Sequence, residues 1–280
     1  MNVQEGCKMK NLAIIGNPVG HSFSPIMHNY ISQVMGLDYT YGAICAEENE
    51  FENLLYSLEE NNYAGVNVTS PFKFNAYNAV DFLSDKARKF GSVNTCVFKN
   101  GKIYGYNTDA DGLYQSLLVS GAEVIDKDIL FIGAGGATKP AVVYFSELGA
   151  KSISIHNRTA KRACDIADYV KDINGYDVEI GINKKHYDLV INTTTVGMSP
   201  NVDATPVNEI PYIDENTFVY DMIYNPEKTL FLKIAEKKGA KTANGLGMLI
   251  YQGIFAYELF TGVKLPDNIY SNILSDVFKK

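Results

Sequence analysis

The stretch DILFIGAGGAT, residues 128–138, decides the fold of this 280-residue chain. Its apolar first half predicts a buried strand, and apolar residues at helical spacing follow over residues 139–149. Between them, Gly133 permits a tight turn and Gly135 lets the backbone approach a pyrophosphate at the helix N-terminus. Thr138 replaces the third glycine of the GxGxxG pattern, so a purely structural connection between strand and helix stays open as an alternative.

The end of the next strand distinguishes between two dinucleotides. An NAD-binding turn usually has a carboxylate about 20 residues further on, which binds the ribose 2′-hydroxyl. Here the strand within residues 151–159 ends in HNRT, and Arg158, Lys161 and Arg162 supply cations where a carboxylate is expected. A guanidinium pairs with a phosphate through two charge-assisted hydrogen bonds. The pattern therefore favours NADP, unless the two arginines are solvated surface charges.

Outside this stretch, β-like runs alternate with helical patterns along most of the chain. The expected strands lie at residues 11–16, 38–46 and 63–69, and in a second series at 128–137, 151–159, 187–194 and 217–224. Asn100–Gly101 predicts a type I′ turn that closes a hairpin. Strands separated by helices indicate mostly parallel sheets.

We therefore expect an α/β fold of two domains with a cleft between them. The first is a substrate-binding and catalytic domain with a mostly parallel sheet, formed by residues 1–108 together with 246–280. The second is a doubly wound dinucleotide-binding domain of Rossmann type, residues 109–245. Clefts between domains are a preferred place for small-molecule sites.

The composition argues against several classes of protein. Hydrophobic residues make up 46% and charged residues 20% of the chain, which is typical of a globular protein. The net charge of -7, without a basic run, argues against nucleic acid as a partner. Four scattered cysteines suit free thiols in a reducing cytoplasm, and the four histidines lack metal-type spacing.

No apolar run reaches the length of a membrane span, and the first residues lack the apolar core of a signal peptide. We interpret residues 1–10 as a short disordered lead-in, because regular patterning begins at Asn11. The sequence leaves open whether the protein is a monomer or a homodimer.

The motif NVTSPFK, residues 67–73, places a lysine early in an expected helix. Pro71 suits the first turn, with Thr69 or Ser70 as the cap. The helix dipole disfavours a cation at this end by roughly 0.3–1 kcal/mol. Lys73 is therefore either an exposed lysine with its head in water, or a catalytic one whose proton exchange this field assists. From this motif alone, both interpretations stay open.

Five further polar residues are candidates for a site. Asp109 in YNTDADG suits chemistry beside Lys73, or an N-cap. Ser22 and Ser24 in GHSFSP suit a carboxylate at a helix N-terminus, although Ser24 also suits a plain N-cap. Asn94, expected in a strand, and Gln252, in an apolar terminal helix, are binding groups or satisfied core amides.

Together these motifs resemble the shikimate dehydrogenase family, from Asn11 into the last helices. Eight motifs occur in the family's order: GNPVGHSFSP, NVTSPFK, GSVNT, YNTDADG, GAGGAT, NRT, DMIYNP and GLGMLIYQ. The resemblance implies a cytoplasmic oxidoreductase that reduces 3-dehydroshikimate to shikimate with NADPH, in the pathway to chorismate and the aromatic amino acids. Ser70 and Asn244 depart from the family's usual aliphatic and acidic residues, and neither change removes a group that the chemistry needs.

The resemblance also implies a role for each candidate residue. Lys73 and Asp109 would be the catalytic pair. The residues that would bind the substrate are, near its carboxylate, Ser22, Ser24 and Tyr224, and at its ring hydroxyls Thr69, Asn94 and Gln252. The residues that would bind NADP are Gly133, Gly135, Gly136 and Ala137 at the pyrophosphate, Asn157, Arg158, Thr159 and Arg162 at the 2′-phosphate, and Met222 and Gly245 near the nicotinamide.

Three alternatives differ in testable ways. A quinate/shikimate dehydrogenase that uses NAD would be expected to have the missing carboxylate after the second strand, and would turn over quinate with NAD. A methylenetetrahydrofolate dehydrogenase shares the two-domain plan, but these motifs give no reason to expect a pterin. A non-catalytic NADP-binding sensor on the same fold would lack the chemistry of Lys73 or Asp109.

Overall fold

The computed structural model describes residues 9–279 and separates them into two compact units. Unit 1 runs up to Thr108 and resumes at Gln252, and unit 2 is Asp109–Tyr251. The assignment of substrate and dinucleotide binding to separate domains stays a prediction. The expected lead-in falls mainly on residues 1–8, which lie outside the described residues, and the first strand begins at Lys10.

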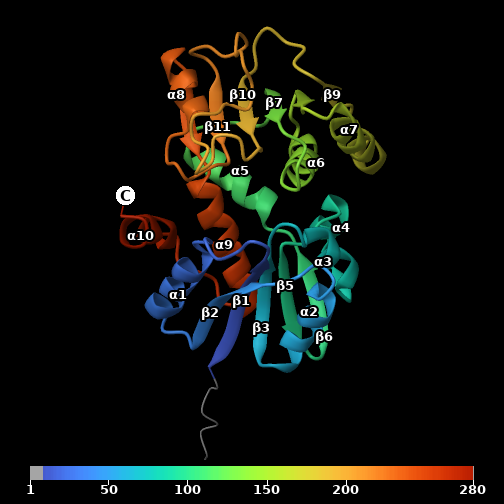
Figure 1. The fold of residues 1–280 in the computed structure, drawn as a ribbon, viewed down its shortest axis with the longest axis vertical. Helices are drawn as coiled ribbons and strands as arrows, with labels where there is room; N and C mark the ends of the chain where they lie inside the picture. Colours follow the sequence, from blue (N-terminus) through green and yellow to red (C-terminus); the bar gives the residue numbers. More distant parts are fainter. Residues whose placement is uncertain (1–8, 280) are drawn as a thin grey trace, which may run out of the picture. The chain divides into compact units, whose positions relative to one another are not determined.

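Unit 1 contains a mixed, mostly parallel sheet (Figure 1). Its strands, in the order β2-β1-β3-β5-β6-β4 across the sheet, are β1 (Lys10–Gly16), β2 (Tyr39–Cys45), β3 (Tyr63–Val68), β4 (Phe82–Leu83), β5 (Thr95–Lys99) and β6 (Lys102–Tyr106). Strand β1 pairs in parallel with β2 and β3, whereas β5 is antiparallel to both of its neighbours. The predicted hairpin turn is confirmed, because Asn100 and Gly101 both have positive φ, 55° and 70°.

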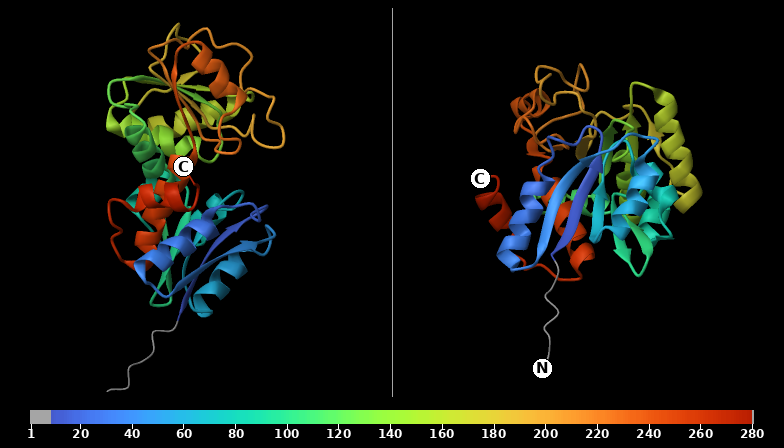
Figure 2. Two further views of the ribbon diagram at one scale, coloured as in Figure 1. Left: turned by 90° about the vertical axis from the view of Figure 1, so that its left-hand side faces the viewer. Right: turned by 60° about the horizontal axis from the view of Figure 1, so that its bottom comes forward.

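Helices cover both faces of this sheet, as the left-hand view of Figure 2 shows. The helices of unit 1 are α1 (Ser24–Met35), α2 (Phe51–Glu60), α3 (Lys73–Ala79), α4 (Asp85–Phe90), the later part of α9 (Leu246–Thr261) and α10 (Ile269–Asp276). Ala13 and Ile15 of β1 pack in one core with residues of α2 and α3. Leu12 points to the other face of the sheet. The residue paired with it in β2 is Tyr41, whose ring stacks on His28 of α1.

Unit 2 contains a second sheet in which every strand pair is parallel. Its strands, in the order β12-β11-β10-β7-β8-β9, are β7 (Asp128–Ile132), β8 (Ser152–His156), β9 (Glu179–Ile180), β10 (Leu189–Asn192), β11 (Phe218–Asp221) and β12 (Lys241–Asn244). Its helices are α5 (Asp109–Val119), α6 (Thr138–Leu148), α7 (Ala160–Asn174), α8 (Leu230–Lys237) and the first part of α9.

Both faces of the second sheet are also covered. Phe131 of β7 packs on Phe145 of α6, with 5.8 Å between the ring centroids. Its neighbours Leu130 and Ile132 point the other way, into a core that includes Phe231 of α8. Strands that are buried on both faces have continuous apolar sequences, such as LFI in β7 and LVI in β10. The predicted α/β class and the doubly wound dinucleotide-binding architecture are confirmed.

Three short strands were not predicted, namely β4, β9 and β12. Two of them are only Phe82–Leu83 and Glu179–Ile180, and the third, KTAN, is polar and partly exposed. Each lies at an edge of its sheet, where burial imposes little hydrophobic patterning. Within residues 9–279, no helix combines the length and the apolar character that crossing a bilayer requires.

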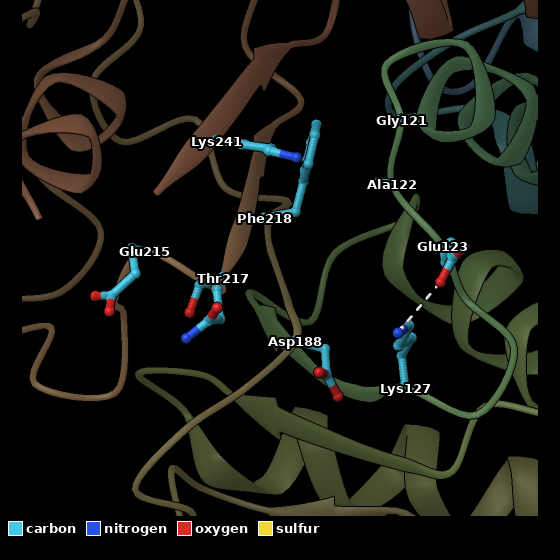
Figure 3. A pocket seen from close by; sticks show the side chains of 10 residues that line it. Gly121, Ala122, Glu123, Lys127, Asp188, Glu215, Thr217, Phe218 and Lys241 are labelled. Atoms are coloured by element: carbon cyan, nitrogen blue, oxygen red, sulfur yellow. Dashed lines mark ion pairs between the residues drawn. The ribbon is translucent and has the colours of Figure 1, made fainter. Parts of the chain in front are cut away.

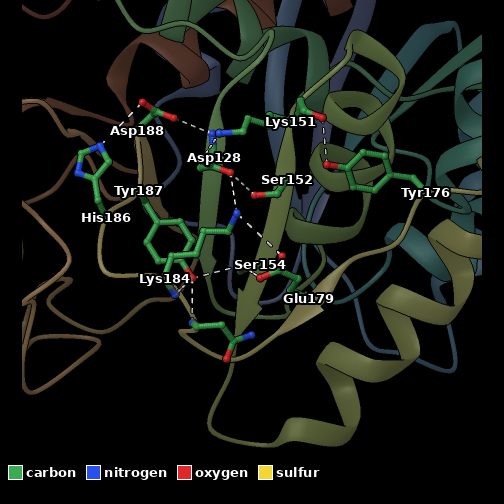
Figure 4. Close-up of polar contacts among 12 residues, drawn as sticks. Asp128, Lys151, Ser152, Ser154, Tyr176, Glu179, Lys184, His186, Tyr187 and Asp188 are labelled. Carbon is green, nitrogen blue, oxygen red and sulfur yellow. Dashed lines mark hydrogen bonds and ion pairs between the residues drawn. The ribbon is translucent and has the colours of Figure 1, made fainter.

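A charged cluster holds together the amino ends of β7 and β8 (Figure 4). The carboxylate of Asp128 accepts hydrogen bonds from Lys184 Nζ at 2.7 Å, from Lys151 Nζ at 2.9 Å and from the Ser152 hydroxyl. Burial alone would raise the pKa of Asp128, but these three donors outweigh it and lower the pKa below the ordinary value. The cluster therefore stabilises the sheet at the end away from the glycine turn.

Replacing Asp128 with asparagine should lower the free energy of unfolding by about 1 kcal/mol at neutral pH, because solvent screens much of each ion pair. The folded pKa lies below the ordinary value of 3.8, so the contribution is complete above that value and declines as pH falls toward the folded pKa. Thermal unfolding of both proteins from neutral pH down to about pH 2 measures the difference. A difference that does not shrink below about pH 4 would contradict this account of the cluster.

Candidate active site

Lys73 is the first residue of α3, directly after a turn that leaves β3. The amide of Thr69 donates to the carbonyl of Ile15 at 2.9 Å, and the amide of Phe72 donates to the carbonyl of Thr69 at 3.0 Å. Phe72 is fully buried and stacks on Phe51, so its packing fixes where the helix begins. Lys73 is half-buried, in the first turn as expected.

Two local predictions about this turn are wrong. Pro71 precedes the helix, because α3 begins two residues later than the proline would require. The residue before the helix is Phe72, and no side-chain hydrogen bond caps the helix there, so neither Thr69 nor Ser70 is the cap. The burial of Phe72 decides the start, and the capping preferences of the polar residues do not.

The two serines of GHSFSP have different roles from those expected of a cap. Helix α1 begins at Ser24 and follows Phe23, so the interpretation of Ser24 as an N-cap is wrong. Instead, the Ser22 hydroxyl accepts a hydrogen bond from the amide of Ser24 at 3.2 Å. Ser24 is buried, 3% exposed. Ser22 is half-buried at the start of this helix.

Asn94 holds the segment that leads into α5. It was expected in a strand but lies one residue before β5, which is a correction of its position. Its Oδ1 accepts from the amide of Thr108 at 2.9 Å and from the Thr95 hydroxyl at 2.9 Å, while its Nδ2 donates to the Thr108 hydroxyl at 3.0 Å. Asp109 follows Thr108 directly. It is buried and is the first residue of α5, so it starts the helix rather than preceding it as a cap.

The topology of unit 1 brings five of its predicted site residues to one edge of the sheet. Strands β1 and β3 are parallel, with Ile15 opposite Val68, so their carboxyl ends meet at this edge. Strand β5 is antiparallel to β3, with Thr95 opposite Asn67, so its amino end lies at the same edge. The residues that follow or precede these strand ends are Ser22, Ser24, Thr69, Lys73 and Asn94. Gln252, the sixth, is half-buried within α9.

The glycine turn of unit 2 has the geometry that the sequence predicted. Gly133 has a φ of 116°, and a Cβ on it would overlap the hydroxyl of Thr193. That hydroxyl is also 2.8 Å from the hydroxyl of Thr138, the residue in the place of the third glycine. Thr138 therefore ties the beginning of α6 to the end of β10, and the departure from GxGxxG has a structural role.

The turn fits a pyrophosphate. A Cβ on Gly135 or Gly136 would meet no atom within 4 Å, so the backbone there is open to a ligand. Ala137 precedes α6, whose N-terminus presents backbone donors and the positive end of the helix dipole. These residues would hold the diphosphate of a dinucleotide.

The residues after β8 suit a 2′-phosphate, because they include the two arginines that the sequence analysis singled out. Ile132 is opposite His156 in the parallel pair, so the residues after β8 lie at the same edge as the glycine turn. Arg158 and Thr159 are exposed, and Arg162 is exposed on α7. Asn157 Nδ2 donates to the carbonyl of Thr159 at 2.9 Å, which shapes the loop that presents Arg158.

The segment after β11 is held by a buried carboxylate that the sequence did not single out. Asp221 accepts from Asn192 Nδ2 at 2.9 Å, from the Thr229 hydroxyl at 2.7 Å and from the amide of Ile223 at 3.1 Å. Burial raises the pKa of Asp221 despite these bonds. Burial likewise raises the pKa of Tyr224, which is half-buried. Asp221 thus fixes the turn that contains Met222 and Tyr224.

Gly245 lies beside this turn. Its amide donates to the carbonyl of Ile223 at 3.2 Å, and a Cβ on Gly245 would overlap the backbone carbonyl of Met222. Asp221 is opposite Asn244 in the parallel pair, so this contact also lies at the carboxyl edge of the sheet. All the residues predicted to bind the cofactor therefore gather along one edge of the unit 2 sheet.

An open pocket of about 250 Å³ lies at the other edge of that sheet (Figure 3). Its lining includes Lys127, Asp188, Thr217 and Lys241, each at or just before the amino end of a strand. Ligands of doubly wound sheets bind outside the carboxyl ends of the strands. The pocket is therefore not the predicted dinucleotide site.

Sequence reasoning missed several residues that support the site. They are Tyr41, Asn67, Thr193 and Asp221, all hydrogen bonded to or in contact with predicted site residues or their neighbours. Asn67 had a signal, because it is a polar residue inside an apolar strand that ends in a predicted site motif. Tyr41 and Thr193 had none, because only the register of the sheets brings them to the site.

Comparison with known proteins agrees with the fold. Three family models match the chain: the substrate binding domain of shikimate dehydrogenase over residues 14–96, shikimate / quinate 5-dehydrogenase over 118–224, and the shikimate 5′-dehydrogenase C-terminal domain over 245–268. A shikimate dehydrogenase (NADP⁺) of Methanococcus maripaludis is 41% identical over 93% of this chain and 94% of its own.

Solved structures extend the likeness to three dimensions. A shikimate dehydrogenase crystallised with NADP⁺ has a TM-score of 0.91 at 36% identity, covering 98% of this chain and 97% of its own. The Thermus thermophilus shikimate 5-dehydrogenase in complex with NADP(H) and shikimate has a TM-score of 0.85 at 31% identity, covering 94% and 98%. With similarity of this extent in sequence and in both domains of the fold, the chain belongs to the shikimate dehydrogenase family.

Proposed function

We propose that this protein catalyses the reversible, NADPH-dependent reduction of 3-dehydroshikimate to shikimate. The observation that supports it most is the sheet edge in unit 1 where Ser22, Ser24, Thr69, Lys73 and Asn94 gather, in a chain 41% identical to an NADP⁺-dependent shikimate dehydrogenase. We further propose that it acts in the cytoplasm, as a monomer or homodimer, in the pathway to the aromatic amino acids.

The substrate needs a set of groups that matches this edge. Its carboxylate requires hydrogen-bond donors, and Ser22 and Ser24 at the beginning of α1 supply hydroxyls beside a helix N-terminus, with Tyr224 as a further donor. Its ring hydroxyls require donors and acceptors in fixed directions, for which we propose Thr69, Asn94 and Gln252. The hydrogen bonds of Asn94 to Thr95 and Thr108 hold its amide in one orientation.

The cofactor is assigned to the glycine turn of unit 2. The open backbone at Gly135 and Gly136 would receive the diphosphate, and Arg158 with Arg162 would pair with the 2′-phosphate. Met222 and Gly245 would lie near the nicotinamide. When bound, NADPH supplies the hydride that reduces the ketone.

The remaining chemistry belongs to Lys73 and Asp109. Reduction of a ketone creates negative charge on its oxygen, and a positioned ammonium both stabilises this charge and provides a proton. We assign that role to Lys73. Asp109 would orient the lysine and accept a hydrogen bond from a substrate hydroxyl, a role suited to a buried side chain whose neighbour Thr108 is held by Asn94.

Incubation of the purified protein with shikimate and NADP⁺ tests the proposal directly. Formation of NADPH, followed by its absorbance, should depend on shikimate, and quinate with NAD⁺ should give far less activity because β8 ends without a carboxylate. Absence of NADP⁺ reduction with shikimate would overturn the proposal. Preferred turnover of quinate with NAD⁺ would assign the protein to the other activity within the family.

A further inference from the structure

A phenol hydroxyl lies between two predicted substrate-binding regions of unit 1. Tyr41 of β2 is 4% exposed, and its hydroxyl donates to Oδ1 of Asn67 at 2.7 Å. Its ring stacks on His28 of α1. Tyr41 therefore joins the beginning of α1 to the end of β3, although no motif includes it.

Asn67 extends the connection to the start of β5. Asn67 is only 5% exposed. Its Nδ2 donates to the backbone carbonyl of Asn94 at 3.2 Å and to the Thr95 hydroxyl at 3.1 Å. The Thr95 hydroxyl in turn donates to Oδ1 of Asn94 at 2.9 Å. A continuous buried network of hydrogen bonds thus runs from Tyr41 through Asn67 to Asn94.

The chemistry of these groups fixes the direction of each bond. An amide oxygen only accepts, so Tyr41 must give its single O–H to Asn67. Burial raises the pKa of Tyr41 well above the ordinary value, so the phenol keeps its proton. In the bond between Tyr41 and Asn67, the phenol is therefore the donor and the amide oxygen is the acceptor.

The surroundings keep the network dry and uncharged. The ring of His28 stacks on Tyr41 with 4.1 Å between centroids, and its Nδ1 is 2.9 Å from the carbonyl of Ser24. Burial lowers the pKa of His28 to about 4, so the imidazole is neutral near neutral pH. In such an environment an unpaired polar group is costly, which makes the position of Asn94 depend on the hydrogen bond between Tyr41 and Asn67.

We propose that Tyr41 is a positioning residue for the substrate, which holds Asn94 through Asn67. The proposal rests on the proposed function, because that function assigns Asn94 to the ring hydroxyls of shikimate. Tyr41 does not touch the substrate in this account. It acts by keeping this binding group in the orientation that the substrate needs.

The first experiment compares Tyr41→Phe with the unaltered protein. Loss of the hydroxyl should raise KM for shikimate roughly tenfold and leave KM for NADP⁺ unchanged, because the cofactor residues belong to unit 2. In the Asn94→Ala background, the same change should raise KM by a smaller factor, because the binding group that Tyr41 holds in place is then missing. A purely structural role predicts no such dependence on Asn94.

Tyr257→Phe is the matched control. Tyr257 is also buried in unit 1, its hydroxyl is 2.8 Å from the hydroxyl of Ser32, and its ring is near His28. Within the described part of the chain, its hydroxyl is hydrogen bonded to Ser32 and not to Asn67 or Asn94. Its loss of one buried hydrogen bond should lower Tm by a similar amount while KM for shikimate stays unchanged.

Several results would overturn the proposal. These are an unchanged KM for shikimate in Tyr41→Phe, an equal rise for NADP⁺, an equal rise in Tyr257→Phe, or full multiplication of the Asn94→Ala and Tyr41→Phe effects. If Tyr41→Phe does not fold, Asn67→Ser breaks the same network and should raise KM for shikimate in the same selective way. An unaltered protein that fails to oxidise shikimate would instead refute the proposed function, and this inference with it.

Discussion

Replacing Lys73 with alanine is expected to lower kcat for shikimate oxidation roughly 10²–10⁴-fold, with a much smaller change in KM. The reason is that the charge on the substrate oxygen develops mainly as the hydride moves, so the ammonium is needed more in the transition state than in the bound complex. The helix that begins at Lys73 does not favour a cation at its N-terminus, so the lysine is placed there at a cost to local stability.

Two further variants sharpen this test. Lys73→Arg keeps a positive charge but has a group that does not release its proton, so it separates electrostatic stabilisation from proton transfer. Lys86→Ala is the matched control, since Lys86 is an exposed lysine early in α4 of the same unit, and its kcat should equal that of the unaltered protein. An unchanged kcat in Lys73→Ala would remove this residue from the mechanism.

Replacing Arg158 with alanine is expected to raise KM for NADP⁺ roughly ten- to a hundredfold and to leave KM for NAD⁺ unchanged. A hydrogen bond to a charged group contributes about 1.5–3 kcal/mol, and solvent reduces this at an exposed side chain such as Arg158. NAD⁺ has no 2′-phosphate, so its binding does not depend on Arg158. Initial rates with each cofactor at saturating shikimate measure the ratio.

Lys171→Ala provides the control for this cation. Lys171 lies on α7 like Arg162, but it pairs with Asp177 at 2.7 Å near the other end of the helix. Its removal changes the net charge of the protein by the same amount and should leave both KM values as they are. Equal losses for NADP⁺ and NAD⁺ in Arg158→Ala would contradict the assignment of this arginine to the 2′-phosphate.

Local patterns predicted much of this fold because local physics sets them. The glycine turn after β7 and the Asn100–Gly101 turn each need a backbone conformation that few residue types adopt. The presence of glycine and asparagine at these positions therefore indicates a turn. The cations after β8 could be placed at the carboxyl end of the sheet from the sequence, because the strand before them is buried and has a clear apolar pattern. Short edge strands such as β4 and β9 bury little and leave no comparable pattern.

The errors occurred where tertiary packing decides a local question. Pro71 and Ser24 both have strong preferences near helix starts, yet α3 begins where Phe72 is anchored and α1 begins after Phe23. The hydrogen bond between Tyr41 and Asn67 depends on the register between β1, β2 and β3. A sequence does not show such register until the strands are paired, so supporting residues are harder to predict than the groups they support.

The crowding at Gly245 has a consequence for protein engineering. The atom that blocks a methyl group there is a main-chain oxygen, which has no rotamer to adopt and is itself tied to the turn that Asp221 holds. A library of substitutions at this position would therefore select against every larger residue, whatever its polarity. To alter cofactor preference, residues can be substituted in the solvent-facing loop around Arg158. Almost no substitution is tolerated at Gly245, where the backbone contacts that of Met222.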